Sequence, residues 1–145
     1  VNMLNSLGYD CEGSDFSKKI ISIAKNNYPN FKDKFHIEDI FNQNNKTKFD
    51  LILVSEVLEH LNEYDKALKE IYKQNAEYFL FTVPYEPLWR ILNLLRGKYL
   101  LRLGNTPGHI NHWSPKSFQK TVAKNFKIVD IKTTVPFIYV LAKKP

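Results

Sequence analysis

The pattern of apolar and polar residues predicts strands that alternate with helices. The clearest strand is the run 49–54, whose uniform apolarity is typical of a parallel strand buried on both faces. A second apolar and aromatic strand covers 77–83 and ends before Pro84. Weaker patterns predict four more strands, over 9–14, 35–37, 127–134 and 135–143.

Helical signals lie between these strands. Gly8 ends a short helix over 3–7, Ser17 caps a helix that stops before Pro29, and a third helix starts near Asn62. Ser114 and Pro115 start the last helix. The polar run 42–46 is predicted to be a surface loop. This order predicts an α/β fold with a mostly parallel sheet, helices on both faces and an antiparallel C-terminal edge.

The composition indicates a folded domain in a reducing compartment. The chain has 145 residues, of which 43% are hydrophobic and 14% aromatic, enough for one domain with a buried core. The single Cys11 excludes a disulfide framework and favours a cytoplasmic location. No apolar run has the length of a transmembrane helix, and the first residues lack the pattern of a secretory signal.

The net charge of +6 is compatible with an anionic partner. The lysines are scattered, however, and no basic run exceeds two residues. This distribution is typical of solvated faces, so we do not expect nucleic acid as a partner.

Ionisable side chains crowd the exit of the strongest strand. Glu56, Glu59 and His60 follow the apolar run 49–54 almost directly. Polar groups at the carboxyl end of a buried parallel strand lie where open α/β sheets bind ligands. This part of the chain is therefore the first candidate for a functional site.

Four segments, in order, resemble the class I S-adenosylmethionine-dependent methyltransferases, in particular the small type 11 enzymes. They resemble the second to fifth strands of that family, and they are 7–17, 35–40, 49–61 and 81–84. The resemblance implies a Rossmann-like fold, S-adenosylmethionine as cofactor and methyl transfer to a small-molecule acceptor. Oxygen is the preferred acceptor atom.

The resemblance also implies cofactor contacts. Asp15 matches the carboxylate that accepts hydrogen bonds from the ribose hydroxyls, and Asp39 the group that binds the adenine amine. Phe16 and Ile40 match the residues on either side of the adenine ring, and Ser55 lies beside the methionine portion. Each residue has a structural alternative: a cap for Asp15, a turn for Asp39, and core packing for Phe16 and Ile40.

The chain departs from the family at its start. Gly8 and Gly13 do not form the glycine-rich cofactor loop, and the family's first strand should precede Val1. We therefore expect residues 1–145 to be a single, partial methyltransferase domain that lacks the first strand. Such a chain can be inactive by itself.

Glu56, His109 and His112 are the candidate catalytic residues, and either histidine can act as a base over the acceptor. The set Glu56, Glu59, His60 and His109 also resembles a metal site of ubiquinone-pathway O-methyltransferases and of small-RNA 2′-O-methyltransferases. In both subgroups two carboxylates and two histidines hold a divalent ion such as Mg²⁺. The alternative is that Glu59 and His60 only start a helix.

Residues 85–113 are predicted to cover the substrate. Within them, 88–103 are strongly apolar but carry four cations: Arg90, Arg96, Lys98 and Arg102. We expect a lid over an apolar or anionic acceptor. A packed helical hairpin and a peripheral contact with a membrane are the alternatives.

Two other functions stay open. One is a metal-assisted RNA 2′-O-methyltransferase, which requires the four metal-site residues to converge. The other is a non-catalytic interaction module that retains the fold. A nicotinamide dehydrogenase has less support, because the residues after the 49–54 strand have no role in that reaction.

Overall fold

The computed structural model describes residues 1–42 and 47–145. The chain divides into two compact units, Val1–Asn44 and Asn45–Pro145, and each is described by itself. Most of the predicted loop 42–46 lies outside the described residues. None of the described helices has the length and apolar character needed to cross a membrane.

The first unit is a two-stranded parallel sheet with helices around it. Its elements are α1 (Asn2–Ser6), β1 (Gly13–Asp15), α2 (Lys18–Asn27), the 3₁₀ helix η1 (Pro29–Lys34) and β2 (Phe35–Ile37). The predicted cap is confirmed, because Ser17 Oγ accepts a hydrogen bond from the backbone N–H of Ile20. The unit therefore follows the predicted order of helix, strand, helix and strand.

The strand predicted over 9–14 begins four residues later. The Asn5 side chain donates to the Cys11 carbonyl at 2.6 Å and accepts from the Cys11 N–H at 3.4 Å. The backbone of Cys11 therefore pairs with a side chain rather than with a strand, and β1 starts at Gly13.

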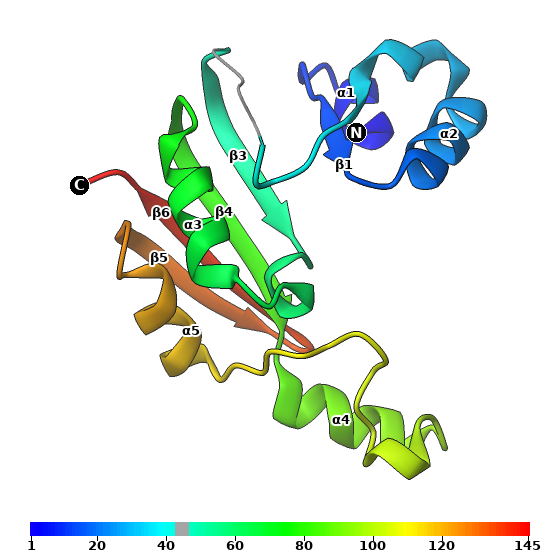
Figure 1. The fold of residues 1–145 in the computed structure, drawn as a ribbon, viewed down its shortest axis with the longest axis vertical. Coiled ribbons are helices and arrows are strands. Elements are labelled where there is room, and N and C mark those ends of the chain that lie inside the picture. The colour runs from blue at the N-terminus through cyan, green and yellow to red at the C-terminus, as the bar shows by residue number, and fades with distance from the viewer. Residues whose placement is uncertain (43–46) are drawn as a thin grey trace. The chain divides into compact units, whose positions relative to one another are not determined.

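The second unit is a four-stranded sheet with the order β3-β4-β6-β5 (Figure 1). Its elements are β3 (Phe49–Ser55), η2 (Leu58–His60), α3 (Tyr64–Lys73), β4 (Ala76–Pro84), α4 (Glu86–Leu95), η3 (Leu100–Arg102), α5 (Pro115–Val122), β5 (Lys127–Thr134) and β6 (Phe137–Lys143). Strands β3 and β4 are parallel, and β6 runs antiparallel to both of its neighbours. The predicted α/β class and the antiparallel C-terminal edge are confirmed.

The core of the second unit lies between this sheet and helices α3 and α5, which Figure 1 shows on the same side of the sheet. Phe126 is its centre, with its ring 4.9 Å from that of Phe79 and 5.2 Å from that of Phe81. From the two covering helices, Leu68 of α3 and Phe118 of α5 are also fully buried. The burial of these apolar side chains is the main stabilising contribution to the unit.

One expectation about β3 is wrong, because only one of its faces is buried. Val54 is 6% exposed, whereas Leu51 and Leu53 are 48% and 52% exposed. Successive side chains of a strand point to opposite faces, and α3 and α5 cover only one face of the sheet. Strand β3 is also the last strand of the sheet on its side.

Candidate active site

The candidate active site begins where β3 and β4 end side by side. The Glu56 N–H donates to the Thr82 carbonyl at 3.1 Å, and Thr82 Oγ1 lies 3.0 Å from Glu56 Oε1 and 3.1 Å from Ser55 Oγ. Glu56 has a φ of 54°, which is uncommon for a residue with a side chain. This left-handed residue turns the chain out of the strand, and β4 fixes its carboxylate.

Glu59 is the most deeply buried ionisable residue of the site. It lies on η2 with 0% exposure, and neither carboxylate oxygen accepts a hydrogen bond from the described residues. Its backbone carbonyl accepts from the N–H groups of Ile110 and Asn111, at 2.9 and 3.1 Å. The Asn111 side chain donates to the carbonyls of Leu58 and Leu61 at 3.0 and 2.7 Å. These bonds attach η2 to the loop that carries the histidines.

The imidazole rings of His60 and His109 lie close to each other and to the Glu59 side chain. His60 Nδ1 lies 2.9 Å from the Gly108 carbonyl, so Nδ1 carries the proton and Nε2 is free to accept. His60 Nε2 is 3.8 Å from Glu59 Oε1. The His60 and His109 rings are 4.9 Å apart and nearly perpendicular. The predicted neighbours His60 and His109 are therefore in contact.

Glu86 is a site residue that the sequence reasoning missed. It is 1% exposed at the start of α4, and its Oε1 lies 2.5 Å from His109 Nδ1. Its Oε2 is 3.5 Å from His112 Nδ1. Glu86 therefore orients His109 through a hydrogen bond, and its second oxygen faces His112 without a hydrogen bond among the described residues. Its signal in the sequence is a carboxylate two residues after the end of a strand, the same signal that identified Glu56.

Burial shifts the two carboxyl groups after β3 toward their protonated forms. The pKa of Glu59 is raised to about 8, first by burial and then by the negative charges of Glu56 and Glu86. The pKa of Glu56 is also raised, because its burial outweighs the opposing effects of Thr82 and the two histidines. At neutral pH the metal-free site therefore holds Glu59 mostly as the neutral acid.

Three of the four predicted metal ligands converge. One ligand atom each of Glu59, His60 and His109 lies within 4.8 Å of the others, and Glu56 is outside this group. Because the Nδ1 atoms of both histidines are engaged, each Nε2 is available to a metal, as is usual for histidine ligands. The buried Glu59 carboxylate, which has no hydrogen-bond partner among the described residues, is also suited to binding a metal. Two imidazoles favour Mn²⁺ or Zn²⁺ over Mg²⁺, which binds mainly oxygen.

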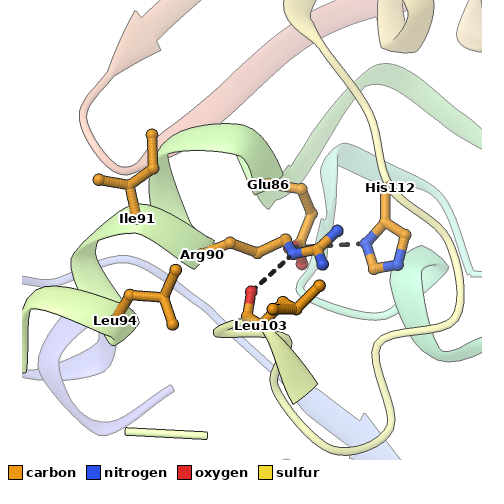
Figure 2. Close-up of a pocket in the computed structure, with 6 residues that line it drawn as sticks. All are labelled: Glu86, Arg90, Ile91, Leu94, Leu103 and His112. Atoms are coloured by element: carbon orange, nitrogen blue, oxygen red, sulfur yellow. Dashed lines mark hydrogen bonds and ion pairs between the residues drawn. The ribbon is translucent and has the colours of Figure 1, made fainter. Parts of the chain in front are cut away.

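A pocket of about 380 Å³ lies beside Glu86 and His112 (Figure 2). Its remaining lining residues are Arg90, Ile91, Leu94 and Leu103. Arg90 Nε donates to the Leu103 carbonyl at 3.2 Å, and Figure 2 shows its guanidinium extending from α4 toward Glu86 and His112. The pocket thus combines an apolar wall, one cation and a half-exposed imidazole.

The predicted adenosine contacts lie in the first unit, at the carboxyl ends of β1 and β2. Asp15 Oδ1 accepts from the Ser17 N–H at 2.7 Å, as in a turn that leads into the Ser17 cap. Asp39 Oδ1 accepts from the Phe41 N–H at 2.9 Å, as in a turn. Phe16 is 78% exposed and Ile40 is partly buried, so Phe16 does not serve core packing. A carboxylate with a free second oxygen beside an exposed ring fits an adenosine.

In both units, polar groups lie at the carboxyl ends of parallel strands, where open α/β sheets bind ligands. Residues 1–130 match the family model described as "Methyltransferase domain", and the chain belongs to this family of S-adenosylmethionine-dependent enzymes. The predicted family, activity class and methyl donor are thereby confirmed. No curated protein matches the chain.

Several solved structures share this fold. The PH0226 protein from Pyrococcus horikoshii OT3 is 15% identical, with a TM-score of 0.75 over 99% of this chain and 77% of its own. The N-methyltransferase NodS from Bradyrhizobium japonicum WM9, in complex with S-adenosyl-L-homocysteine, is 15% identical, with a TM-score of 0.61 over 91% and 65%. Magnesium protoporphyrin IX methyltransferase (ChlM) from Synechocystis PCC 6803, with bound SAH, is 17% identical, with a TM-score of 0.63 over 92% and 63%.

Proposed function

We propose that the enzyme methylates an oxygen atom of a small, amphipathic acceptor. The observation that carries this proposal is the His112–Glu86 pair on the wall of the apolar pocket. A hydroxyl must lose its proton to become a good nucleophile, and an imidazole held by a carboxylate is a suitable base. His112 is preferred over His109 because its side chain is 36% exposed and lines the pocket, whereas that of His109 is 9% exposed.

The bound S-adenosylmethionine supplies a methyl group that an in-line displacement transfers. His112 takes the proton of the acceptor hydroxyl at its free ring nitrogen, and Glu86 stabilises the imidazolium that forms. Asp15 and Phe16 hold the adenosine, Asp39 and Ile40 complete its adenine contacts, and Ser55 leaves room for the methionine portion. Glu56, fixed by Thr82, keeps the strand end in place.

The acceptor has an apolar body and an anionic group. Ile91, Leu94 and Leu103 provide an apolar wall in the segment that was predicted to cover the substrate. Arg90 is the cation of this wall, and a guanidinium binds carboxylate or phosphate in two-point contacts. The type 11 subgroup and a cytoplasmic location, which the free Cys11 favours, belong to the same proposal.

Matched probes test this proposal. The three probes are hydroxyphenyl-octanoate, octylphenol without the carboxylate, and aminophenyl-octanoate with an amine in place of the hydroxyl. We expect methylation of the first, weaker binding of the second, and a loss of about 10²- to 10⁴-fold in kcat for His112→Gln. His36→Gln, in the first unit, is the control and should be unchanged. Equal rates with the amine, or an unaffected His112→Gln variant, contradict the oxygen preference and the base.

The second candidate is metal-assisted RNA 2′-O-methylation, for which three of the four required residues, Glu59, His60 and His109, converge while Glu56 lies outside the group. These residues would hold a divalent ion that binds the acceptor oxygens. Mn²⁺ binding, measured by calorimetry, should be lost in His109→Asn and kept in His36→Asn. A short RNA and its 3′-terminal 2′-deoxy form are the substrates to compare. Full turnover in chelator, or no methylation of the RNA, rejects this candidate.

A further inference from the structure

The segment after β4 presents leucines to solvent. Leu101 is fully exposed, Leu95 is 79% exposed, and Leu100 and Leu103 are each more than half exposed. Tyr99, between them, is 41% exposed. Single exposed leucines are ordinary, but a run of them in nine residues marks an interaction site. We call residues 94–103 the leucine tip.

The fold holds this tip in shape from its base. Asn93 is 5% exposed, and its Nδ2 donates to the Gly104 carbonyl at 2.9 Å and to Thr106 Oγ1 at 3.2 Å. Trp89 Nε1 donates to the same Thr106 hydroxyl at 2.9 Å. A Cβ at Gly104 would lie 2.2 Å from the Arg90 carbonyl, so the close approach of the two arms requires glycine. These contacts join the two ends of the segment that carries the leucines.

Backbone conformation adds to this arrangement. Tyr99 and Leu103 both have positive φ angles, 53° and 49°, which are rare for bulky residues. The Gly104 N–H donates to the Tyr99 carbonyl at 3.0 Å, which closes a tight turn around η3. The turn keeps Leu100 and Leu101 at the end of the segment, away from the pocket wall.

The charge of the segment is of one sign. From residue 87 to residue 129 the sequence has no aspartate and no glutamate. Within this stretch Arg96, Lys98 and Arg102 lie among the exposed leucines, and Arg90 lies at the base. Exposed leucines surrounded by cations are the surface that peripheral proteins present to anionic lipids.

We propose that the leucine tip docks the enzyme on an anionic lipid bilayer. Leu95, Leu100 and Leu101 insert at the boundary between headgroups and acyl chains, and Arg96, Lys98 and Arg102 contact lipid phosphates. Tyr99 lies at the interface, which suits its amphipathic ring. The proposal is independent of the methyl acceptor, because the side chains assigned to the lipid do not line the pocket, whose wall includes only Leu94 and Leu103 of the tip.

Vesicle flotation with the full chain tests the docking. The vesicles are phosphatidylcholine alone and phosphatidylcholine mixed with phosphatidylglycerol. We expect the enzyme to float with the mixed vesicles only, and less at high ionic strength. The triple variant R96Q/K98Q/R102Q should bind at least about tenfold more weakly. The pair L95Q/L101Q should lose binding to a similar extent.

The control is the triple variant K116Q/K120Q/K127Q, which removes the same charge elsewhere in the second unit. Both triples lower the net charge from +6 to +3, so a difference between them depends on position alone. Equal loss in the two triples, or unchanged binding of L95Q/L101Q, overturns the docking site. A change of oligomeric state in L95Q/L101Q, seen by light scattering, assigns the tip to a second copy and also overturns it. Unchanged circular dichroism shows that each variant is folded.

Discussion

At the scale of single residues, Glu59 has the most unusual environment. Burial deprives its carboxylate of water, and the nearby carboxylates of Glu56 and Glu86 make the charged form still less favourable. The folded protein keeps this proton up to about pH 8, whereas the unfolded chain loses it near the ordinary value of 4.5. Unfolding in this range therefore releases a proton.

Glu59→Gln should flatten the pH dependence of stability. In chelator, the wild-type free energy of unfolding should fall between about pH 5 and pH 8, by up to about 1.4 kcal/mol per pH unit from this residue. The free energy of unfolding decreases as the pH rises because the folded state binds more protons than the unfolded state. The variant has no such proton and should become the more stable protein as the pH rises. Urea unfolding at several pH values measures this, with the exposed Glu77→Gln as the control. Parallel curves for Glu59→Gln and wild type contradict the shift.

The sequence predicted part of this site for a physical reason. Glu56, Glu59 and His60 follow a strand directly, so the strand end alone placed them at the ligand-binding edge. Glu86 and Asn111 act through bonds across 23 and 50 or more residues of chain. Such bonds depend on how the loop folds back, and no local pattern reports that. The same holds for Glu56, whose bond to Thr82 keeps it out of the metal group.

At the scale of elements, the end of the Ser114 loop is the best-defined start of a helix. Ser114 Oγ accepts from the Ser117 N–H at 3.2 Å, and Ser117 Oγ accepts from the Ser114 N–H at 2.9 Å. This reciprocal pair satisfies two backbone N–H groups at the start of α5. Trp113, just before it, is 6% exposed, and its ring lies 5.3 Å from that of Phe118 in a tilted arrangement.

Ser114→Ala should destabilise the second unit by about 1 kcal/mol, because the first turn of α5 loses its cap. Urea unfolding, monitored by tryptophan fluorescence, measures the change in the free energy of unfolding. Ser114→Asp is the matched variant and should stay near wild type, since aspartate caps equally well and favours the helix dipole. If both variants lose the same stability, the cap is not the cause.

Helices and strands were predictable because their signals are local. The caps Ser17 and Ser114 and the apolar runs 49–54 and 77–83 each act within a few residues. The position of β6 between β4 and β5 was not predictable in the same way, because it depends on pairings between distant residues such as Phe81 and Val140. The half-exposed face of β3 was missed for the same reason, since apolarity alone does not show what covers a strand.

At the larger scale of the second unit, β3 is the last strand of the four-stranded sheet. Leu51 and Leu53 are half exposed on the last strand of the four-stranded sheet. Strand edges with apolar side chains pair readily with other chains, and proteins often protect them with lysine. The second unit therefore has a strand edge that favours self-association.

The double variant L51K/L53K should reduce concentration-dependent association, because two charges oppose edge pairing. Light scattering over a range of concentrations measures this. M3K/L7K is the control, because Met3 and Leu7 of the first unit are 69% and 67% exposed and lie outside the sheets. An equal effect of both variants shows that added charge, and not the edge, is responsible.

The two oxygens of Glu86 have an evolutionary consequence. One oxygen serves His109 and the other faces His112, so a substitution at this position changes both histidines at once. Natural variation can therefore rarely adjust one of them alone through Glu86. No such dual role applies to the pocket residues Ile91, Leu94 and Leu103. Each of them can change size without disturbing the histidines. New acceptors are thus most easily acquired through these three positions, while the proton-handling residues stay as they are.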